Sequence, residues 1–324
     1  LRPVGGWLSD RFGGYRLLVV LLAGFSVCFA GVASAQSVGM ASVLLFLAAT
    51  PAAPIRVSGV GFATPESVLH DTAADLYLVS NINGSPLEKD DNGFISRVSP
   101  EGQVLALKWI DGAAEGVTLN APKGMAISGD TLYVADIDTL RTFDRATGAP
   151  KGEIAVKGAT FLNDLAVAPA GGVYLTDSGL KAGAAGFEPS GSAAVYHVHA
   201  DGTVEALLKD AKLPGPNGVA FDGERVLVVT FGANELFTVE GGARKVLTQL
   251  PKGGLDGLVR LPDGRWAVSS WEGQAVYVGP VSGPFAEMMT GIPAPADVGI
   301  DTGREGLLSP RFMDHEVVIQ PIAR

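Results

Sequence analysis

Three features of the sequence predict an all-β fold, a six-bladed β-propeller. A short motif with a polar residue at its head recurs six times along the chain. A β-prone run begins nine or ten residues after each head, and a second β-prone run follows before the next copy. A unit of several antiparallel strands repeated about every 40 to 55 residues is typical of a propeller blade, so six copies predict six blades.

The clearest copy of the motif is Asn217-Gly218-Val219-Ala220-Phe221-Asp222. Its first residue changes in character between copies, and we call the six first residues the head residues. They are Glu66, Lys123, Asn163, Asn217, Asp256 and Asp297. The first β-prone runs are 76–80, 132–136, 173–177, 226–230, 266–270 and 307–310, and the second are 94–98, 140–144, 194–198, 235–239, 275–279 and 316–320. These runs are rich in Val, Tyr, Ile and Phe, which pack well on a pleated surface.

The sixth copy needs one more strand, because the chain ends soon after its second β-prone run. We expect residues 55–62 to supply it, which would pair the two ends of the propeller and remove two open sheet edges. Copies one and three are longer than the others, and their extra residues fall at 82–93 and 180–192. These two segments are candidate walls or lids over one face, with ordinary surface loops as the alternative.

Residues 1–53 are predicted to be an apolar leader and residues 54–324 the propeller. Residues 17–55 contain no Asp, Glu, Lys or Arg, and 17–35 is long enough to span a bilayer. One interpretation is a signal peptide with a cleavage site at Ala33-Ser34-Ala35. Another is a transporter-derived fragment, because residues 6–14 resemble a cytoplasmic loop motif of major facilitator transporters, most of all the nitrate/nitrite branch. The leader predicts a periplasmic or secreted protein, with a membrane tether through residues 17–53 as an option.

The charge of the chain limits its partners. The net charge is −10 with scattered Lys and Arg, whereas nucleic-acid binding needs a clustered basic surface. We therefore expect a small-molecule substrate and no nucleic acid, while the sequence names no protein partner. The single Cys28 excludes an intrachain disulfide and lies outside the repeats.

The head residues are the candidate functional site. The innermost strand of every blade runs along the central channel, so residues far apart in sequence can meet at one end of it. Carboxylate and amide oxygens suit Ca²⁺, which takes six to eight oxygen ligands. Zinc is disfavoured by the absence of Cys and of paired His, and we expect His197 and His199 to face solvent rather than to be metal ligands. The alternative for Asn217-Gly218 and Asp256-Gly257 is that they are ordinary hairpin turns.

These residues resemble the senescence marker protein/gluconolactonase (regucalcin-like) family over residues 55–324. The resemblance implies a six-bladed propeller with a catalytic calcium, or another divalent cation, held by Glu66, Asn163, Asn217 and Asp256. It further implies metal-assisted hydrolysis of a lactone or ester, with a phosphoester as an alternative. Asp256 would act as general base or nucleophile.

Two residues depart from the pattern of that family. Lys123 places an ammonium among the head residues, where it would pair with Glu66 or Asp297, point away, or weaken calcium binding. Phe161 stands where the sugar-lactone enzymes of the family often have Arg, which favours a less polar substrate. The predicted substrate-binding residues are Phe161, Asp164, Lys123 and Asp297. The alternative function is a non-catalytic binding or scaffold propeller of the NHL-repeat type.

Overall fold

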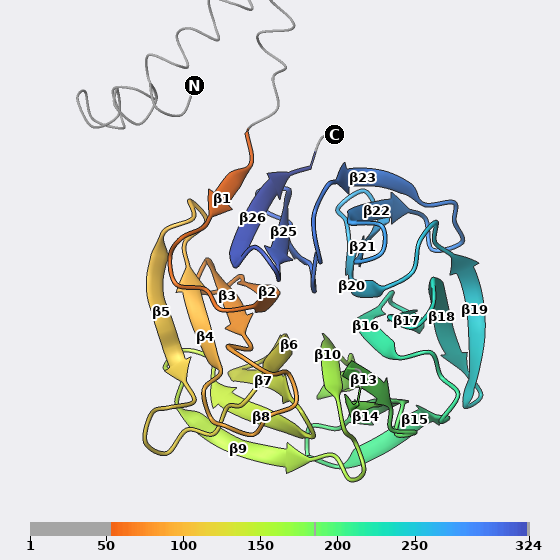
Figure 1. Cartoon of the computed structure of the whole chain (residues 1–324), viewed down its shortest axis with the longest axis horizontal. Coiled ribbons are helices and arrows are strands. Elements are labelled where there is room, and N and C mark those ends of the chain that lie inside the picture. Colours follow the sequence, from red (N-terminus) through yellow and green to blue (C-terminus); the bar gives the residue numbers. More distant parts are fainter. Residues whose placement is uncertain (1–52, 185, 323–324) are drawn as a thin grey trace, which may run out of the picture. The chain divides into compact units, whose positions relative to one another are not determined.

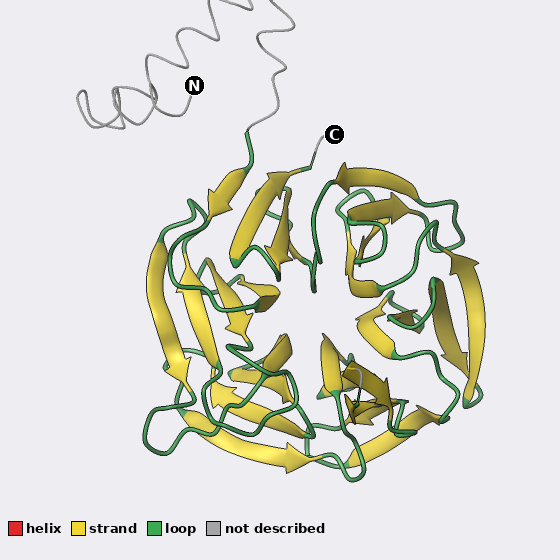
Figure 2. Cartoon of the chain, viewed as in Figure 1, coloured by secondary structure: helices red, strands yellow, loops and turns green. Residues whose placement is uncertain are grey.

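The computed structural model describes residues 53–184 and 186–322, which form a six-bladed β-propeller (Figure 1). Each blade is a four-stranded antiparallel sheet, and the six sheets stand around a central axis with their first strands innermost (Figure 2). The described residues contain strands, turns and bends but no helix. Accordingly, they include no helix of the length and apolarity needed to cross a membrane.

The blades follow one another along the chain. Blade one has β2 (Pro65–Asp71), β3 (Leu76–Asn81), β4 (Phe94–Val98) and β5 (Val104–Asp111). Blade two has β6 (Pro122–Ser128), β7 (Thr131–Asp136), β8 (Thr139–Asp144) and β9 (Pro150–Ala155). Blade three has β10 (Leu162–Val167), β11 (Val173–Asp177), β14 (Ala194–Val198) and β15 (Val204–Lys209), with a separate hairpin of β12 (Leu180–Gly183) and β13 (Gly186–Pro189).

The second half of the ring repeats this plan. Blade four has β16 (Pro216–Phe221), β17 (Val226–Thr230), β18 (Glu235–Glu240) and β19 (Ala243–Gln249). Blade five has β20 (Leu255–Arg260), β21 (Trp266–Ser270), β22 (Ala275–Gly279) and β23 (Ala286–Thr290). Blade six has β24 (Gly299–Asp301), β25 (Gly306–Arg311), β26 (Glu316–Pro321) and, from the other end of the chain, β1 (Ile55–Val57).

The N-terminal strand closes the ring, as the sequence predicts. β1 pairs antiparallel with β26, with Ile55 opposite Ile319 and Val57 opposite Val317. Val57 and Val317 are buried in a cluster that also contains Val79 of blade one. The predicted leader, in contrast, lies almost wholly outside the described residues. Its boundary at residue 53, the signal peptide and the membrane tether therefore stay predictions.

The apolar core is divided between neighbouring blades rather than gathered at the axis. Between blades two and three, for example, Ala135 and Leu140 pack with Leu165 and Leu175. The β-prone runs of the sequence are these strands, and their alternate residues face the two neighbouring blades. The inner strands of the blades line a cavity at the axis, with Ser67, Asp164 and Asp297 among its walls, and we call this space the channel.

A bulge lies at the start of the innermost strand in blades one to five. In each, two residues of the inner strand stand opposite one residue of the second strand; in blade one, Glu66 and Ser67 stand opposite Ser80. The head residue is the first residue within each bulge. A bulge adds one unpaired residue and changes the direction of its side chain. The side chain of a head residue therefore does not follow the regular alternation of side chains along the strand.

The glycine after a head residue is required by close approach of the backbones. A Cβ on Gly218 would lie 2.2 Å from the carbonyl oxygen of Asp256, and one on Gly257 would lie 2.3 Å from the nitrogen of Val298. Both glycines lie within strands, so the hairpin-turn interpretation of Asn217-Gly218 and Asp256-Gly257 is wrong. Glycine is needed at these two positions because the inner strands of the adjacent blades come too close there for a side chain.

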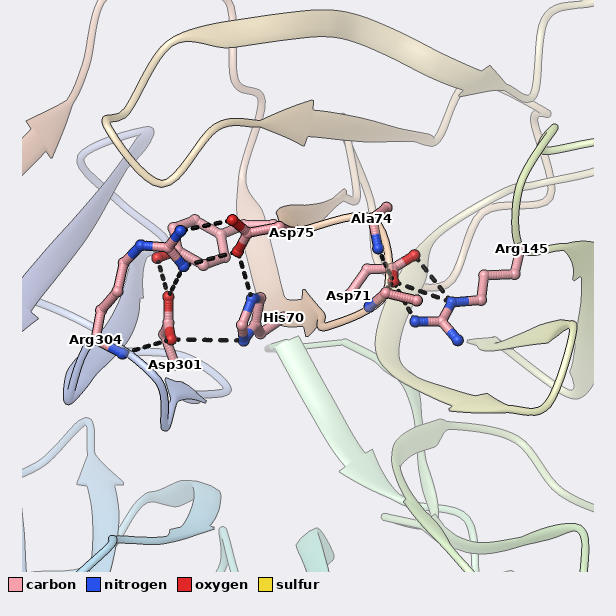
Figure 3. A network of polar contacts seen from close by, with 9 residues as sticks. His70, Asp71, Ala74, Asp75, Arg145, Asp301 and Arg304 are labelled. Atoms are coloured by element: carbon pink, nitrogen blue, oxygen red, sulfur yellow. Dashed lines mark hydrogen bonds and ion pairs between the residues drawn. The ribbon is translucent and has the colours of Figure 1, made fainter.

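Blade one is tied to its neighbours by ion pairs at the hairpin end of β2 (Figure 3). Arg145, which follows β8, donates from Nε and Nη2 to the buried carboxylate of Asp71. On the other side, Arg304 of blade six makes a two-pronged pair with Asp75 at 2.7 and 2.6 Å and also contacts Asp301. These contacts connect blade one to blade two and to blade six, the blade that contains both ends of the propeller.

Replacing Gly218 with Ala should destabilise the propeller by about 2 kcal/mol or more, because the added Cβ overlaps the backbone of blade five. The measurement is the free energy of unfolding in urea. Gly303→Ala is the matched control, since the nearest atom to a Cβ there is 3.4 Å away, and its effect should stay within about 0.5 kcal/mol. Equal effects of the two substitutions would contradict the close-approach explanation.

Asp71→Asn should lower stability at pH 7 by about 1–2 kcal/mol, because it removes the charge that pairs with Arg145. Burial raises the pKa of Asp71, but hydrogen bonds from Arg145 and from the backbone of Ala74 outweigh it, so the net pKa is lowered. A lowered folded pKa gives stability that is present above the unfolded pKa of about 4 and is lost as the pH falls through the folded value.

The difference in free energy of unfolding between the wild type and Asp71→Asn should therefore decrease as the pH falls from about 4 to 3. Urea unfolding of both proteins over that range measures this difference. The carboxyl groups that the two proteins share contribute equally to both stabilities, so their contribution is removed by the subtraction. A difference that is absent at pH 7, or that increases on acidification, would refute the assigned role of the pair.

Candidate metal centre

The six head residues lie at one end of the channel, and all are buried. Five of them belong to the bulges of the inner strands β2, β6, β10, β16 and β20 (Figure 1). Asp297 precedes β24, and its backbone pairs in parallel with Ser67 of blade one. Lys123 is 1% exposed and the other heads are 3–8% exposed. The convergence predicted from the repeats thus places oxygen-bearing side chains of five blades and one ammonium around the axis.

Four buried side-chain oxygens in this ring have no hydrogen-bond partner. They are Glu66 Oε2, Asn163 Oδ1, Asn217 Oδ1 and Asp256 Oδ1. A buried polar atom without a partner costs about 1–3 kcal/mol, so such atoms are rare unless a ligand completes them. The four belong to four different blades and are the four residues that the resemblance assigns to the metal.

The orientation of Asn163 is fixed by its neighbour Ser178. The hydroxyl of Ser178 donates to the carbonyl oxygen of Pro216 at 2.7 Å, so its remaining capacity toward Asn163 is as an acceptor. The amide nitrogen of Asn163 donates to it at 3.2 Å. The amide oxygen of Asn163 is therefore the atom left without a partner.

Asp256 is held in a similar way by Trp271, whose indole nitrogen donates to Oδ2 at 2.6 Å. Ser178 and Trp271 occupy equivalent positions, because each is the first residue after the second strand of its blade. Neither residue was predicted from the sequence to support a head residue. A hydrogen-bonding side chain at that position in two blades is the signal that a blade-by-blade alignment would have revealed.

The carboxyl groups of the ring have raised pKa values. Burial, and then Asp297, raise the pKa of Asp256 to about 8, and burial raises the pKa of Asp297 to about 7. Burial and then the carboxylates of Asp256 and Asp297 raise the pKa of Glu66 well above its ordinary value. Burial and Asp297 do the same for Asp164. A divalent cation would oppose these shifts, since it favours ionised carboxylates.

Lys123 has a different partner from those expected. Its ammonium donates to the carbonyl oxygens of Ala121 at 3.1 Å and Pro86 at 3.2 Å, and it lies 4.5 Å from the ring centroid of Phe161. Burial lowers its pKa to about 8, although the charge of Glu66 opposes the shift. Lys123 thus anchors the long segment 82–93 to the axis through Pro86.

Asp164 and Asp297 join neighbouring blades. The carboxylate of Asp164 accepts from the backbone nitrogen of Val219 in blade four at 2.7 Å and from Leu165 at 2.6 Å. Asp297 accepts from the hydroxyl of Ser67 in blade one at 2.5 Å. Both carboxylates therefore have a structural function, and the substrate-binding role predicted for them stays a prediction.

The two long segments lie on the same face as the ring. β3 ends at Asn81 beside Pro65, and β11 ends at Asp177 opposite Leu162, so the connections that follow emerge at the head-residue end. The second of these connections forms the β12–β13 hairpin, whose Phe187 contacts Phe161 edge to face at 5.9 Å between ring centroids. Phe187 is 56% exposed, which leaves an aromatic surface beside the site.

The residues of the ring fit a hard divalent cation. Their unpaired atoms are carboxylate and amide oxygens, which calcium prefers, and no sulfur or imidazole is among the head residues. Four buried carboxyl groups share this end of the channel with the single ammonium of Lys123. A cation bound by Glu66, Asn163, Asn217 and Asp256 would satisfy the unpaired oxygens and the excess of negative charge.

No family model matches this chain, and no curated protein matches it. The fold is nevertheless shared with solved structures. A gluconolactonase from Xanthomonas campestris is 22% identical with a TM-score of 0.62, covering 86% of this chain and 92% of that one. A protein described as a putative gluconolactonase is 17% identical with a TM-score of 0.61, covering 86% and 97%.

A luciferin-regenerating enzyme is 15% identical with a TM-score of 0.58, covering 84% of this chain and 98% of that one. These comparisons give no support to the transporter resemblance of residues 6–14. At these identities the likeness concerns the fold: this chain is a six-bladed propeller of the kind that the gluconolactonase structures have.

Proposed function

We propose that this protein is a hydrolase of lactones or esters that uses a divalent cation, calcium, at the head-residue end of the channel. The observation that carries the proposal is the set of four buried oxygens without partners, contributed by four blades to one place. A propeller that served only as a scaffold would have no use for such unpaired atoms, since each one lowers stability. The gluconolactonases among the structural neighbours support the same chemistry.

When bound, the cation would polarise the carbonyl oxygen of the substrate and stabilise the negative charge that develops there. Asp256 is the candidate catalytic residue of the chain itself. Trp271 holds one of its oxygens, so the carboxylate is fixed in place, and the unpaired oxygen would serve both as a ligand of the cation and as the atom that meets a water molecule or a reacting carbonyl. It would accept a proton from water as a general base, or attack as a nucleophile.

The walls of the site support a proposal for the substrate class. Phe161 and Phe187 form an aromatic pair beside the head residues, and Phe187 is largely exposed. The guanidinium that the sugar-lactone enzymes often carry at the position of Phe161 is replaced by this apolar ring. We therefore assign the site to a lactone or ester with an apolar portion rather than to a heavily hydroxylated sugar acid.

The wild-type chain should bind one calcium ion at the ring, and Asp256→Asn should weaken binding by at least about tenfold, because ligand charge tunes calcium affinity. Isothermal titration calorimetry measures both. Asp263→Asn is the matched control, because Asp263 lies in the β20–β21 turn of the same blade and pairs with Arg265 in an exposed position. Its calcium affinity should equal that of the wild type.

Without calcium, Asp256→Asn should be at least as stable as the wild type, since a neutral amide replaces a carboxyl group whose ionisation is disfavoured by burial and by Asp297. This comparison separates loss of binding from loss of folding. Equal calcium affinity in Asp256→Asn and the wild type would refute the assignment of the ring.

The calcium-loaded wild type should hydrolyse members of a panel of lactones and aryl esters, and chelation should abolish turnover until calcium is restored. Asp256→Asn should lower kcat/KM by about 10²- to 10⁴-fold, the usual contribution of a general base, while Asp263→Asn leaves it unchanged. Turnover that persists after chelation would contradict the mechanism. Calcium binding without turnover on the whole panel would favour the scaffold function instead.

A further inference from the structure

A second group of ligating side chains lies on blade three, away from the ring. It consists of His197, His199 and Glu205, whose ligand atoms all lie within 4.8 Å of one another. His197 is on β14, His199 follows two residues later on the same face, and Glu205 of β15 stands directly opposite His197. Val198 pairs with Val173, which pairs with Val167 at the far end of β10 from Asn163, so the group lies toward the other end of the blade.

The expectation that both histidines face solvent is wrong for His197. Its side chain is covered by the ring of Tyr174 on the neighbouring strand β11, at 5.1 Å between centroids, and only 7% of the residue is exposed. Tyr174 in turn stacks on Phe221 of blade four. The side chains of His199 and Glu205 are 37% and 57% exposed, so the group is accessible from its outer side.

The hydrogen bond of His197 leaves one of its nitrogens able to bind a metal. Nε2 lies 3.1 Å from the carbonyl oxygen of Gly171, and because a carbonyl oxygen only accepts, Nε2 carries the hydrogen. The lone pair of the neutral ring is then on Nδ1. A hydrogen bond from the other ring nitrogen to a backbone carbonyl is the usual support of a metal-binding histidine.

His199 and Glu205 form the other half of the group. Nε2 of His199 lies 3.1 Å from Oε2 of Glu205, with one proton between the two atoms. The rings of His199 and His197 are in contact, with centroids 3.9 Å apart. A metal ion can take the place of the shared proton, since two ligands of one zinc ion stand about 3.3 Å apart. Asp201, in the turn between the strands, adds negative charge that interacts with His199.

We propose that His197, His199 and Glu205 bind a divalent first-row transition metal of the zinc class. Two imidazoles and a carboxylate favour zinc, copper or nickel, whereas the oxygen ring at the axis favours calcium. Closure around zinc requires the ligand atoms, now within 4.8 Å of one another, to approach by up to about 1.5 Å, and the exposed side chains of His199 and Glu205 can move by this amount. With three protein ligands, a fourth position stays open to water.

The test is competition for Zn²⁺ against a chromophoric chelator, with the whole chain, without a polyhistidine tag and in saturating calcium. The wild type should bind one zinc ion, and His199→Ala and Glu205→Gln should each weaken binding by at least about tenfold. Glu240→Gln, an exposed carboxylate at the end of β18, and Asp256→Asn at the axis are the controls and should bind zinc as the wild type does.

Co²⁺ bound to the wild type should show the visible absorption of a tetrahedral or five-coordinate site, and His199→Ala should lose it. Zinc should also raise the melting temperature of the wild type and Glu240→Gln but not of His199→Ala, while all three melt alike without metal. Unchanged zinc affinity in both His199→Ala and Glu205→Gln overturns the proposal, as does zinc binding that disappears only in Asp256→Asn. Failure of the wild type to bind zinc at millimolar concentration overturns it as well.

Discussion

The close approach of the innermost strands at the axis is the constraint on which this propeller depends. The backbones of neighbouring blades come so near that a Cβ on Gly218 would lie 2.2 Å from the carbonyl oxygen of Asp256. The same proximity brings the bulged head residues of different blades together. Fold and site therefore share one cause: the glycines permit the approach, and the bulges turn polar side chains into the space that it creates.

Bringing these side chains together has an energetic cost that the fold alone does not offset. Glu66 and Asp256 are buried with an oxygen unpaired on each, and burial raises both pKa values. Asp164 and Asp297 offset part of the cost by accepting hydrogen bonds from adjacent blades. The remaining imbalance lies on the four unpaired oxygens, which is where a cation would restore stability. A site that is unfavourable without its ligand is a common property of functional centres.

The repeats were sufficient to predict the blades, the closing strand and the head residues, because these depend on local pattern and on the symmetry of the ring. Contacts between distant segments could not be predicted in this way, because neither the local pattern nor the symmetry of the ring determines them. One of the two carbonyl partners of Lys123 belongs to Pro86, 37 residues away in a loop, whereas the partners proposed from the sequence were the carboxylates of Glu66 and Asp297. The burial of His197 depends on Tyr174 of the adjacent strand, which alternation along one strand does not reveal. The dipeptide Asn-Gly is also found both in hairpin turns and where two backbones approach closely, so the sequence alone does not distinguish the two.

The two departures from the resembled family are parts of one interaction. Lys123 brings a cation where the other head residues bring oxygen, and Phe161 brings an aromatic ring where the sugar-lactone enzymes often carry a guanidinium. In the structure the ammonium lies 4.5 Å from that ring, and its hydrogen bonds go to the carbonyls of Pro86 and Ala121. A cation above an aromatic face is stabilised by the ring quadrupole, more so when both are buried. The ammonium of Lys123 is therefore bound by the backbone and by the ring of Phe161 rather than by the unpaired oxygens. Those four oxygens remain free to hold a cation although Lys123 lies near Glu66.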